Sequence, residues 1–205
     1  MVLADQDDTA ERAFGPVAAS LERIGATPNQ VSVVSFGVAV GAAVGFYTAT
    51  PVTYAVGALL VALSGVLDVV DGQLARRTGE SSAQGDMLDH TLDRYSDLAL
   101  LVGIAGGLDA WALGLFAVTG VFLTSYMGTQ AQAVGAGRDY GGLLGRADRL
   151  ALVVVAGALH PLLPLVAESA EVAGFVPLEW LLILFAVVGN ITAAQRFWAS
   201  WKELS

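Results

Sequence analysis

The chain has 205 residues, of which 55% are hydrophobic and only 14% are charged, and its mean hydropathy is +0.64. A soluble domain carries about a quarter charged residues, so the composition predicts an integral membrane protein with a single domain. The formal net charge of −9 argues against nucleic-acid binding, and the absence of cysteine excludes disulfides, thiol catalysis and zinc–thiolate sites.

The first predicted element is a helix over residues 5–25. Apolar residues recur there at helical spacing, at Phe14, Val17, Ala18 and Leu21. This pattern predicts an amphipathic helix on the membrane surface, and a mobile acidic tail is the alternative.

Six apolar segments follow, and each is long enough to cross a hydrocarbon layer of about 30 Å as a helix. They cover about 30–48, 52–76, 85–107, 110–134, 147–166 and 177–199. The predicted fold class is therefore all-α: one membrane domain over residues 1–205, with six transmembrane helices behind an interfacial helix. In the first segment, Gly37, Gly41 and Gly45 repeat every four residues, which predicts the close approach of another helix.

The basic residues predict the orientation of this domain. Six spans place both termini on one side of the membrane, together with the loops near 77–85 and 135–146. All basic residues fall on that side: Arg12, Arg23, Arg76, Arg77, Arg94, Arg138, Arg146, Arg149, Arg196 and Lys202. The opposite side carries no basic residue, only Asp109, His160, Glu168, Glu171 and Glu179. The positive-inside rule therefore predicts cytoplasmic termini and a multi-pass protein of the cell membrane.

Four aspartates with helical spacing interrupt the second and third apolar segments. Asp68 and Asp71 share one face of the second segment, and Asp89 and Asp93 share one face of the third. Because a short loop joins the segments, the two faces can oppose each other. Converging carboxylates repel unless cations neutralise them, and hard divalent cations with oxygen ligands fit best, Mg²⁺ first and then Mn²⁺ or Ca²⁺. Two metals about 3.5–4 Å apart would balance four carboxylates and could bridge phosphate oxygens.

Residues between the two aspartate pairs suit a phosphate-bearing ligand. Gly72 and Ala75 leave room beside Asp71, Arg76 offers a planar donor fork for phosphate, and Gly85 opens the start of the third segment. The alternative for the aspartates is simple pairing with neighbouring arginines, which would explain one pair but not four carboxylates at these spacings. Asp97, one turn further along, is predicted to pair with Arg94 or to support the ligands.

The stretch from residue 68 to 93 resembles the signature of the CDP-alcohol phosphotransferases, also called CDP-alcohol phosphatidyltransferases. The pattern is Asp68-x2-Asp71-Gly72-x2-Ala75-Arg76-x8-Gly85-x3-Asp89-x3-Asp93, and it fixes eight positions within 26 residues. The six-span layout extends this resemblance over nearly the whole chain.

The resemblance implies an enzyme that binds a CDP-linked lipid and an alcohol acceptor at the cytoplasmic face, forms a phosphodiester and releases CMP. It implies that Asp68, Asp71, Asp89 and Asp93 hold two Mg²⁺ ions, with Mn²⁺ possible, and that Asp93 is also the general base. Members of the family are often homodimers, which glycine-rich spans would permit. The CDP-lipid pocket would be shaped by Gly72, Ala75, Arg76 and Gly85.

The acceptor depends on other residues. The segments 93–97 and 145–149 look like the branch that uses inositol phosphate or glycerol phosphate. Arg146 and Arg149 lie three residues apart at the start of the fifth segment, where they would bind an anionic acceptor; ordinary flanking charge is the alternative. Inositol-phosphate enzymes usually carry basic residues at the end of the fourth segment, but residues 125–132 have none, so both polyol phosphates stay open.

Two further alternatives remain. The acidic, lysine-poor composition suggests a halophilic source, in which case the lipid substrate would be CDP-archaeol instead of CDP-diacylglycerol. A divalent-cation transporter or channel is the alternative function, because carboxylates within a membrane also mark ion paths. The crowding of the acids at one face favours the enzyme.

Overall fold

The computed structural model describes residues 2–137, 144–166 and 171–204. Within these ranges it is all-helical, apart from an isolated bridge between Val172 and Phe175. The described helices are α1 (Val2–Arg23), α2 (Pro28–Thr48), α3 (Pro51–Thr78), α4 (Ala83–Gly107), α5 (Trp111–Ala133), α6 (Arg146–Val166) and α7 (Pro177–Glu203). Each predicted segment corresponds to one helix. Arg138 and Glu168, which entered the orientation argument, lie outside the described residues.

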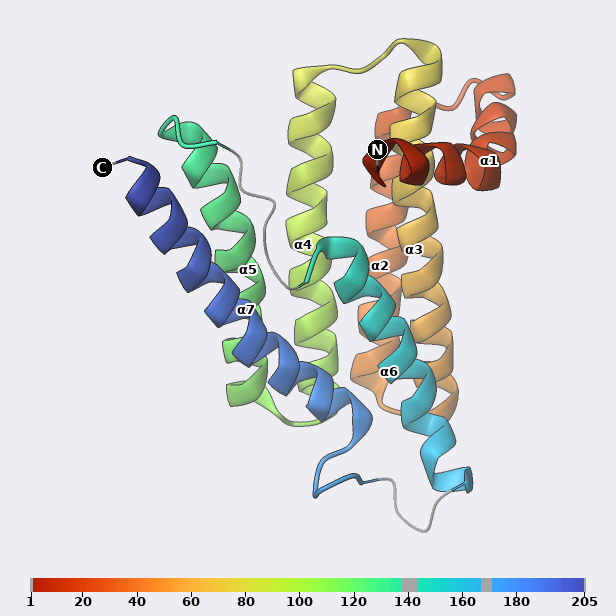
Figure 1. The fold of residues 1–205 in the computed structure, drawn as a ribbon. Coiled ribbons are helices and arrows are strands. Elements are labelled where there is room, and N and C mark those ends of the chain that lie inside the picture. Colours follow the sequence, from red (N-terminus) through yellow and green to blue (C-terminus); the bar gives the residue numbers. More distant parts are fainter. Residues whose placement is uncertain (1, 138–143, 167–170, 205) are drawn as a thin grey trace.

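The long helices form a bundle that α1 crosses near one end (Figure 1). α2 packs between α3 and α4, α6 lies against α3, and α5 pairs with α7. Both termini lie toward the end of the bundle at which α3 and α4 are joined (Figure 1). The all-α prediction is therefore confirmed for the described residues.

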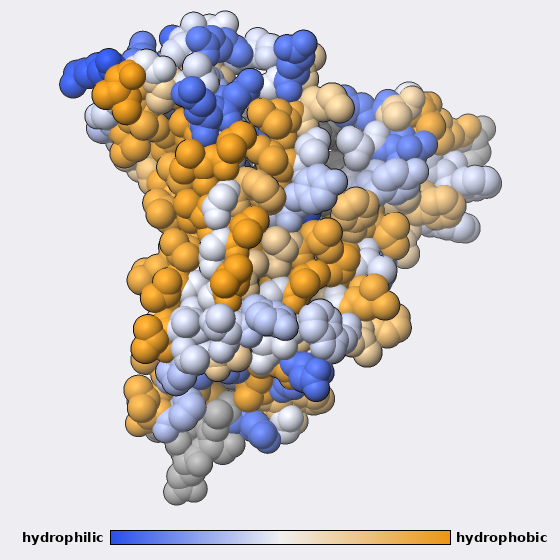
Figure 2. Space-filling model, turned by 180° about the vertical axis from the view of Figure 1, so that it is seen from behind, coloured by the Kyte–Doolittle hydropathy of each residue, from blue (hydrophilic) through white to orange (hydrophobic). Residues whose placement is uncertain are grey.

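The surface of the bundle is that of a membrane protein. Figure 2 shows hydrophobic residues over much of the middle of one face and hydrophilic residues toward its ends. Large apolar side chains such as Leu59, Leu115 and Phe116 are exposed, whereas polar ones such as Ser64 and Thr124 are buried. A soluble protein would not leave so much apolar surface in water.

Five of the described helices are long and apolar enough to cross a membrane: α2, α3, α5, α6 and α7. α4, the third predicted span, forms at the predicted place but is not among them. Its first fifteen residues carry the charged residues Asp86, Asp89, Asp93, Arg94 and Asp97. Because these charges lower its hydropathy, length and composition alone do not mark α4 as a span.

Local sequence determines where the first long helices begin. Thr27 accepts a hydrogen bond from the Gln30 backbone N–H, and the Gln30 side chain accepts one from the Thr27 N–H. Thr50 and Thr53 form the same reciprocal arrangement at the start of α3. In both cases proline follows the cap, where its missing N–H costs no hydrogen bond. The third residue of each helix thus completes the cap at its N-terminus.

Glycine packing follows the prediction only in part. A methyl group on Gly45 would lie 3.0 Å from the Thr53 carbonyl oxygen, so α3 approaches α2 closely at that point. Gly37, by contrast, has open space around it. Gly103 of α4 allows a still closer contact, because a methyl group there would clash with the Ala43 backbone. The glycine that brings α4 against α2 was therefore not one of the predicted three.

α1 covers the end of α3 through part of its predicted apolar face. Ala18 is fully buried and Phe14 and Leu21 are half-buried, but Val17 is 44% exposed. Arg77 Nε of α3 donates to Glu22 Oε2 of α1 at 3.1 Å. The second half of α1 therefore packs on α3.

Candidate functional site

Three of the four aspartates converge between α3 and α4. Asp68, Asp71 and Asp89 each offer a carboxylate oxygen, and these three oxygens lie within 4.8 Å of one another. Asp71 is buried, and Asp68 and Asp89 are half-buried. Asp68 precedes the end of α3 by ten residues, about 15 Å along a helix axis. The cluster thus lies well inside the bundle.

Asp93 joins this cluster through an arginine. Nη2 of Arg146, the first residue of α6, lies 2.7 Å from Asp93 Oδ1, and its Nη1 contacts Asp68 Oδ2. The exposed fractions of the Arg146 and Asp93 side chains are 17% and 13%. The predicted acceptor-binding arginine is therefore in direct contact with two of the predicted metal ligands.

Ser32 is a site residue that the sequence argument missed. Its hydroxyl, on α2, donates to Asp71 Oδ2 at 2.7 Å, and both side chains are buried. A hydroxyl donor stabilises the ionised carboxylate and holds it in one orientation. The only sequence signal was a polar residue one turn into an apolar helix that begins with a cap.

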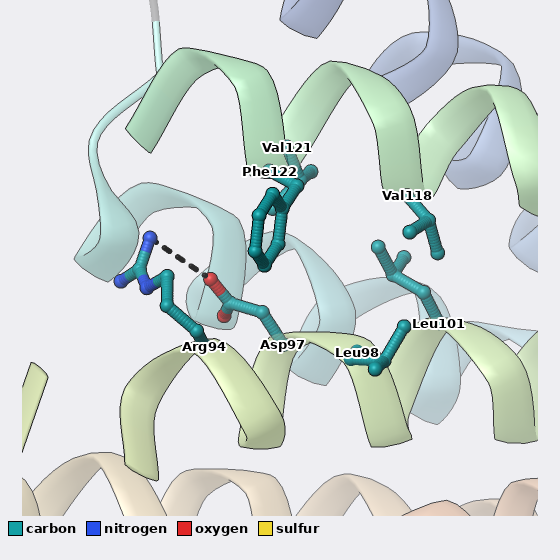
Figure 3. Close-up of a pocket in the computed structure, with 7 residues that line it drawn as sticks. All are labelled: Arg94, Asp97, Leu98, Leu101, Val118, Val121 and Phe122. Atoms are coloured by element: carbon teal, nitrogen blue, oxygen red, sulfur yellow. Dashed lines mark ion pairs between the residues drawn. The ribbon is translucent and has the colours of Figure 1, made fainter. Parts of the chain in front are cut away.

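Asp97 pairs mainly with Arg149 and more loosely with Arg94. Arg149 Nη2 donates to Asp97 Oδ2 at 2.9 Å, and Arg94 Nη1 lies 3.6 Å from the same oxygen. Figure 3 shows the Arg94–Asp97 pair at one end of a small recess between α4 and α5, which Leu98, Val118 and other apolar residues line. Arg149 is buried, so its charge depends on Asp97 for compensation.

The residues predicted to bind the CDP-lipid differ in how tightly the rest of the chain packs around them. A methyl group on Gly72 would meet only Arg76 Nη1, at 3.7 Å, so packing within the chain does not require glycine there. A methyl group on Gly85 would lie 3.3 Å from Ser82 Oγ, the cap of α4, and 3.5 Å from Asn29 Oδ1. Ala75 is half-buried and Arg76 is exposed. Gly72 therefore leaves space next to Asp71 that a ligand could use.

The donor set fits a hard divalent cation. Three carboxylate oxygens this close together repel one another, and oxygen ligands of this kind are those that Mg²⁺ and Mn²⁺ take in proteins. Asp68, Asp71 and Asp89 would hold the ion. Together, the fold and the site define a multi-helix membrane protein with a carboxylate cluster suited to divalent cations and phosphate-bearing ligands.

The sequence profile of the CDP-alcohol phosphatidyltransferase family matches residues 26–199. The chain belongs to this family. It is 33% identical over 189 residues to the archaetidylinositol phosphate synthase of Pyrococcus horikoshii, covering 92% of this chain and 90% of that protein. It is 32% identical over 198 residues to the enzyme of the same name from Methanothermobacter thermautotrophicus, covering 94% and 91%. The chain is therefore a transferase of substituted phosphate groups, as the 68–93 signature implied.

A solved structure supports the same fold. The crystal structure of Mycobacterium tuberculosis phosphatidylinositol phosphate synthase with CDP-DAG bound superimposes with a TM-score of 0.75 at 27% identity, covering 93% of this chain and 94% of that one. The same enzyme in complex with manganese and citrate gives a TM-score of 0.77 at 28% identity, covering 91% and 88%. The prediction of the family is thus confirmed by sequence and by fold.

Proposed function

We propose that this protein transfers the phosphatidyl or archaetidyl group of a CDP-linked lipid to inositol phosphate and releases CMP. The observation that carries the proposal is the arrangement of Asp93 and Arg146 beside the three converging carboxylates. In this proposal Asp93 is the base, Arg146 binds the phosphate of the acceptor, and the three carboxylates form the divalent-cation site.

The reaction assigns each residue a task. The Asp93 carboxylate takes the proton of the acceptor hydroxyl, whose oxygen forms a bond to the lipid-linked phosphorus while the bond to the CMP oxygen breaks. Asp68, Asp71 and Asp89 would hold divalent cations, whose positive charge would neutralise the pyrophosphate. Gly72, Ala75, Arg76 and Gly85 shape the pocket for the CDP group. Two Mg²⁺ ions per site, with Mn²⁺ as a substitute, remain the proposed cofactors.

Inositol phosphate is proposed as the acceptor ahead of glycerol phosphate. The relatives reported above are named archaetidylinositol phosphate synthase and phosphatidylinositol phosphate synthase. We give these names more weight than the absence of basic residues at the end of α5, in residues 125–132. Moreover, Arg196 of α7 donates to the Thr124 carbonyl oxygen at 2.7 Å, so a cation does reach this part of α5. The two archaeal relatives favour an archaetidyl lipid.

An acceptor screen tests the proposal. Purified protein with Mg²⁺ and CDP-archaeol or CDP-diacylglycerol should release CMP with inositol phosphate. Glycerol 3-phosphate, glycerol 1-phosphate, serine and free inositol serve as competing acceptors. CMP release with free inositol alone would refute a phosphorylated acceptor. Protein-dependent cation flux into liposomes without CMP release from any acceptor would instead favour the transporter.

The proposed enzyme has six spans, with α4 as the third, an interfacial α1 and a cytoplasmic site. The support is the distribution of basic residues and the position of Asp89 and Asp93 of α4 at the carboxylate cluster. Because the chain has no cysteine, Ser81→Cys and Glu171→Cys would each introduce a single thiol. A membrane-impermeant thiol reagent added outside intact cells should label Glu171→Cys only. Labelling of Ser81→Cys instead would refute the proposed orientation.

A further inference from the structure

Arg146 binds carboxylates that divalent cations would also bind. Its guanidinium bridges Asp68 of α3 and Asp93 of α4 through two different nitrogens. Both carboxylates are predicted metal ligands, and Asp68 also belongs to the group of three whose oxygens converge. A cation that takes the carboxylate oxygens bonded to Arg146 has to displace the positively charged guanidinium from them. Arg146 and a metal ion would therefore compete for the same partners.

Arg146 also has an unused donor. Its Nε is buried and has no hydrogen-bond partner among the described residues. A guanidinium is a planar fork that fits phosphate as well as carboxylate, so exchanging one partner for the other retains the geometry of its bonds. The position at the first residue of α6 anchors the side chain from the backbone while its tip can change partners.

Arg149, one turn further along α6, provides the contrast. It pairs with Asp97 at 2.9 Å, and Asp97 is not one of the converging carboxylates. Binding of a cation at the cluster would take no partner from Arg149. Of these two arginines of α6, which carry the same charge, only Arg146 would therefore compete with a metal ion at the cluster.

We propose that Arg146 couples the divalent cations to the acceptor by exchanging partners. It neutralises Asp68 and Asp93 until cations take these carboxylates, and the released guanidinium then binds the phosphate of the acceptor. Cation and acceptor phosphate therefore strengthen each other's binding, and the coupling is reciprocal by thermodynamic linkage. The inference rests on the proposed function, because it requires a phosphorylated acceptor.

Metal binding tests this coupling without turnover. The full chain, freed of metal by chelation, is titrated with Mn²⁺ while electron paramagnetic resonance reports free Mn²⁺. The titration is done under three conditions: without acceptor, with free inositol and with inositol phosphate. Titrations without protein correct for Mn²⁺ that the phosphate itself binds. Inositol phosphate should tighten Mn²⁺ binding by roughly 5- to 150-fold, the usual range of coupling between sites, and free inositol should not.

Two matched variants identify the residue responsible. Arg146→Gln should bind Mn²⁺ more tightly than wild type when no acceptor is present and should lose the effect of inositol phosphate. Arg149→Gln should keep the wild-type Mn²⁺ affinity without acceptor. If both variants bind Mn²⁺ more tightly to the same extent, loss of positive charge explains the result and the partner exchange is refuted. Weaker Mn²⁺ binding by Arg146→Gln would likewise refute it.

The outcomes separate this inference from the proposed function. The wild-type protein could release CMP with inositol phosphate and yet show the same Mn²⁺ affinity with and without inositol phosphate. That result would refute the coupling and leave the transferase function intact. Coupled binding of Mn²⁺ and inositol phosphate without CMP release from any acceptor would refute the transferase function instead. The wild-type comparison needs no variant, so the test stands even if Arg146→Gln fails to fold.

Discussion

Replacement of Ser32 by alanine should weaken metal binding, because Ser32 holds the candidate ligand Asp71. The hydroxyl lies 2.7 Å from Asp71 Oδ2 in a buried setting. Without it, the Asp71 carboxylate would lose its donor, and the cation itself would have to fix the orientation of the side chain. A hydrogen bond to a charged group contributes about 1.5–3 kcal/mol, which sets a ceiling of roughly 150-fold on the loss. Residues that support metal ligands typically contribute about 10- to 100-fold.

Ser35→Ala is a matched control on the same helix. Ser35 is also buried, and its hydroxyl lies 2.9 Å from the Ser64 carbonyl oxygen and 3.0 Å from Ser64 Oγ. The Ser35→Ala variant therefore also loses buried hydrogen bonds of a serine hydroxyl, but to neutral groups and not to a candidate ligand. Mn²⁺ titration of both variants, alongside their thermal unfolding, should show a lower Mn²⁺ affinity only for Ser32→Ala. Equal affinities in Ser32→Ala and wild type, or an equal loss in both variants, would refute the reasoning.

Two further predictions concern carboxylates of α4. Asp93→Asn should lower CMP release by about 10²- to 10⁴-fold, the usual contribution of a general base, with CDP-lipid binding retained by equilibrium dialysis; full activity would remove Asp93 from that role. Asp97→Ala should lower the free energy of unfolding by about 3–5 kcal/mol because it leaves the buried Arg149 uncompensated. Glu22→Ala is the control, because it breaks an ion pair whose Arg77 and Glu22 side chains are 40% and 41% exposed. It should lower the free energy of unfolding by under about 1 kcal/mol in the same denaturation assay. An equal loss in Asp97→Ala and Glu22→Ala would contradict the role of burial.

The composition and periodicity of the sequence predicted most of the fold. Helix boundaries follow from local chemistry, since the capping boxes at Thr27 and Thr50 and the left-handed Gly79 after α3 need no distant partner. The aspartate spacings likewise placed each pair on one face of one helix, and the short loop between α3 and α4 allows these faces to meet at one end of the bundle. These features depend on residues close in the sequence.

Only the tertiary structure decided what surrounds the aspartates. Ser32 lies 39 residues from Asp71, Arg149 lies 52 from Asp97, and Arg146 lies 78 from Asp68. Helical periodicity specifies which residues share a face but not which helix packs against that face. The packing of α2 and α6 on α3 depends on many contacts at once, such as Gly45 against Thr53. The sequence by itself therefore determined the candidate ligands and their spacing, whereas packing between distant helices decided that Arg146 would contact two of them.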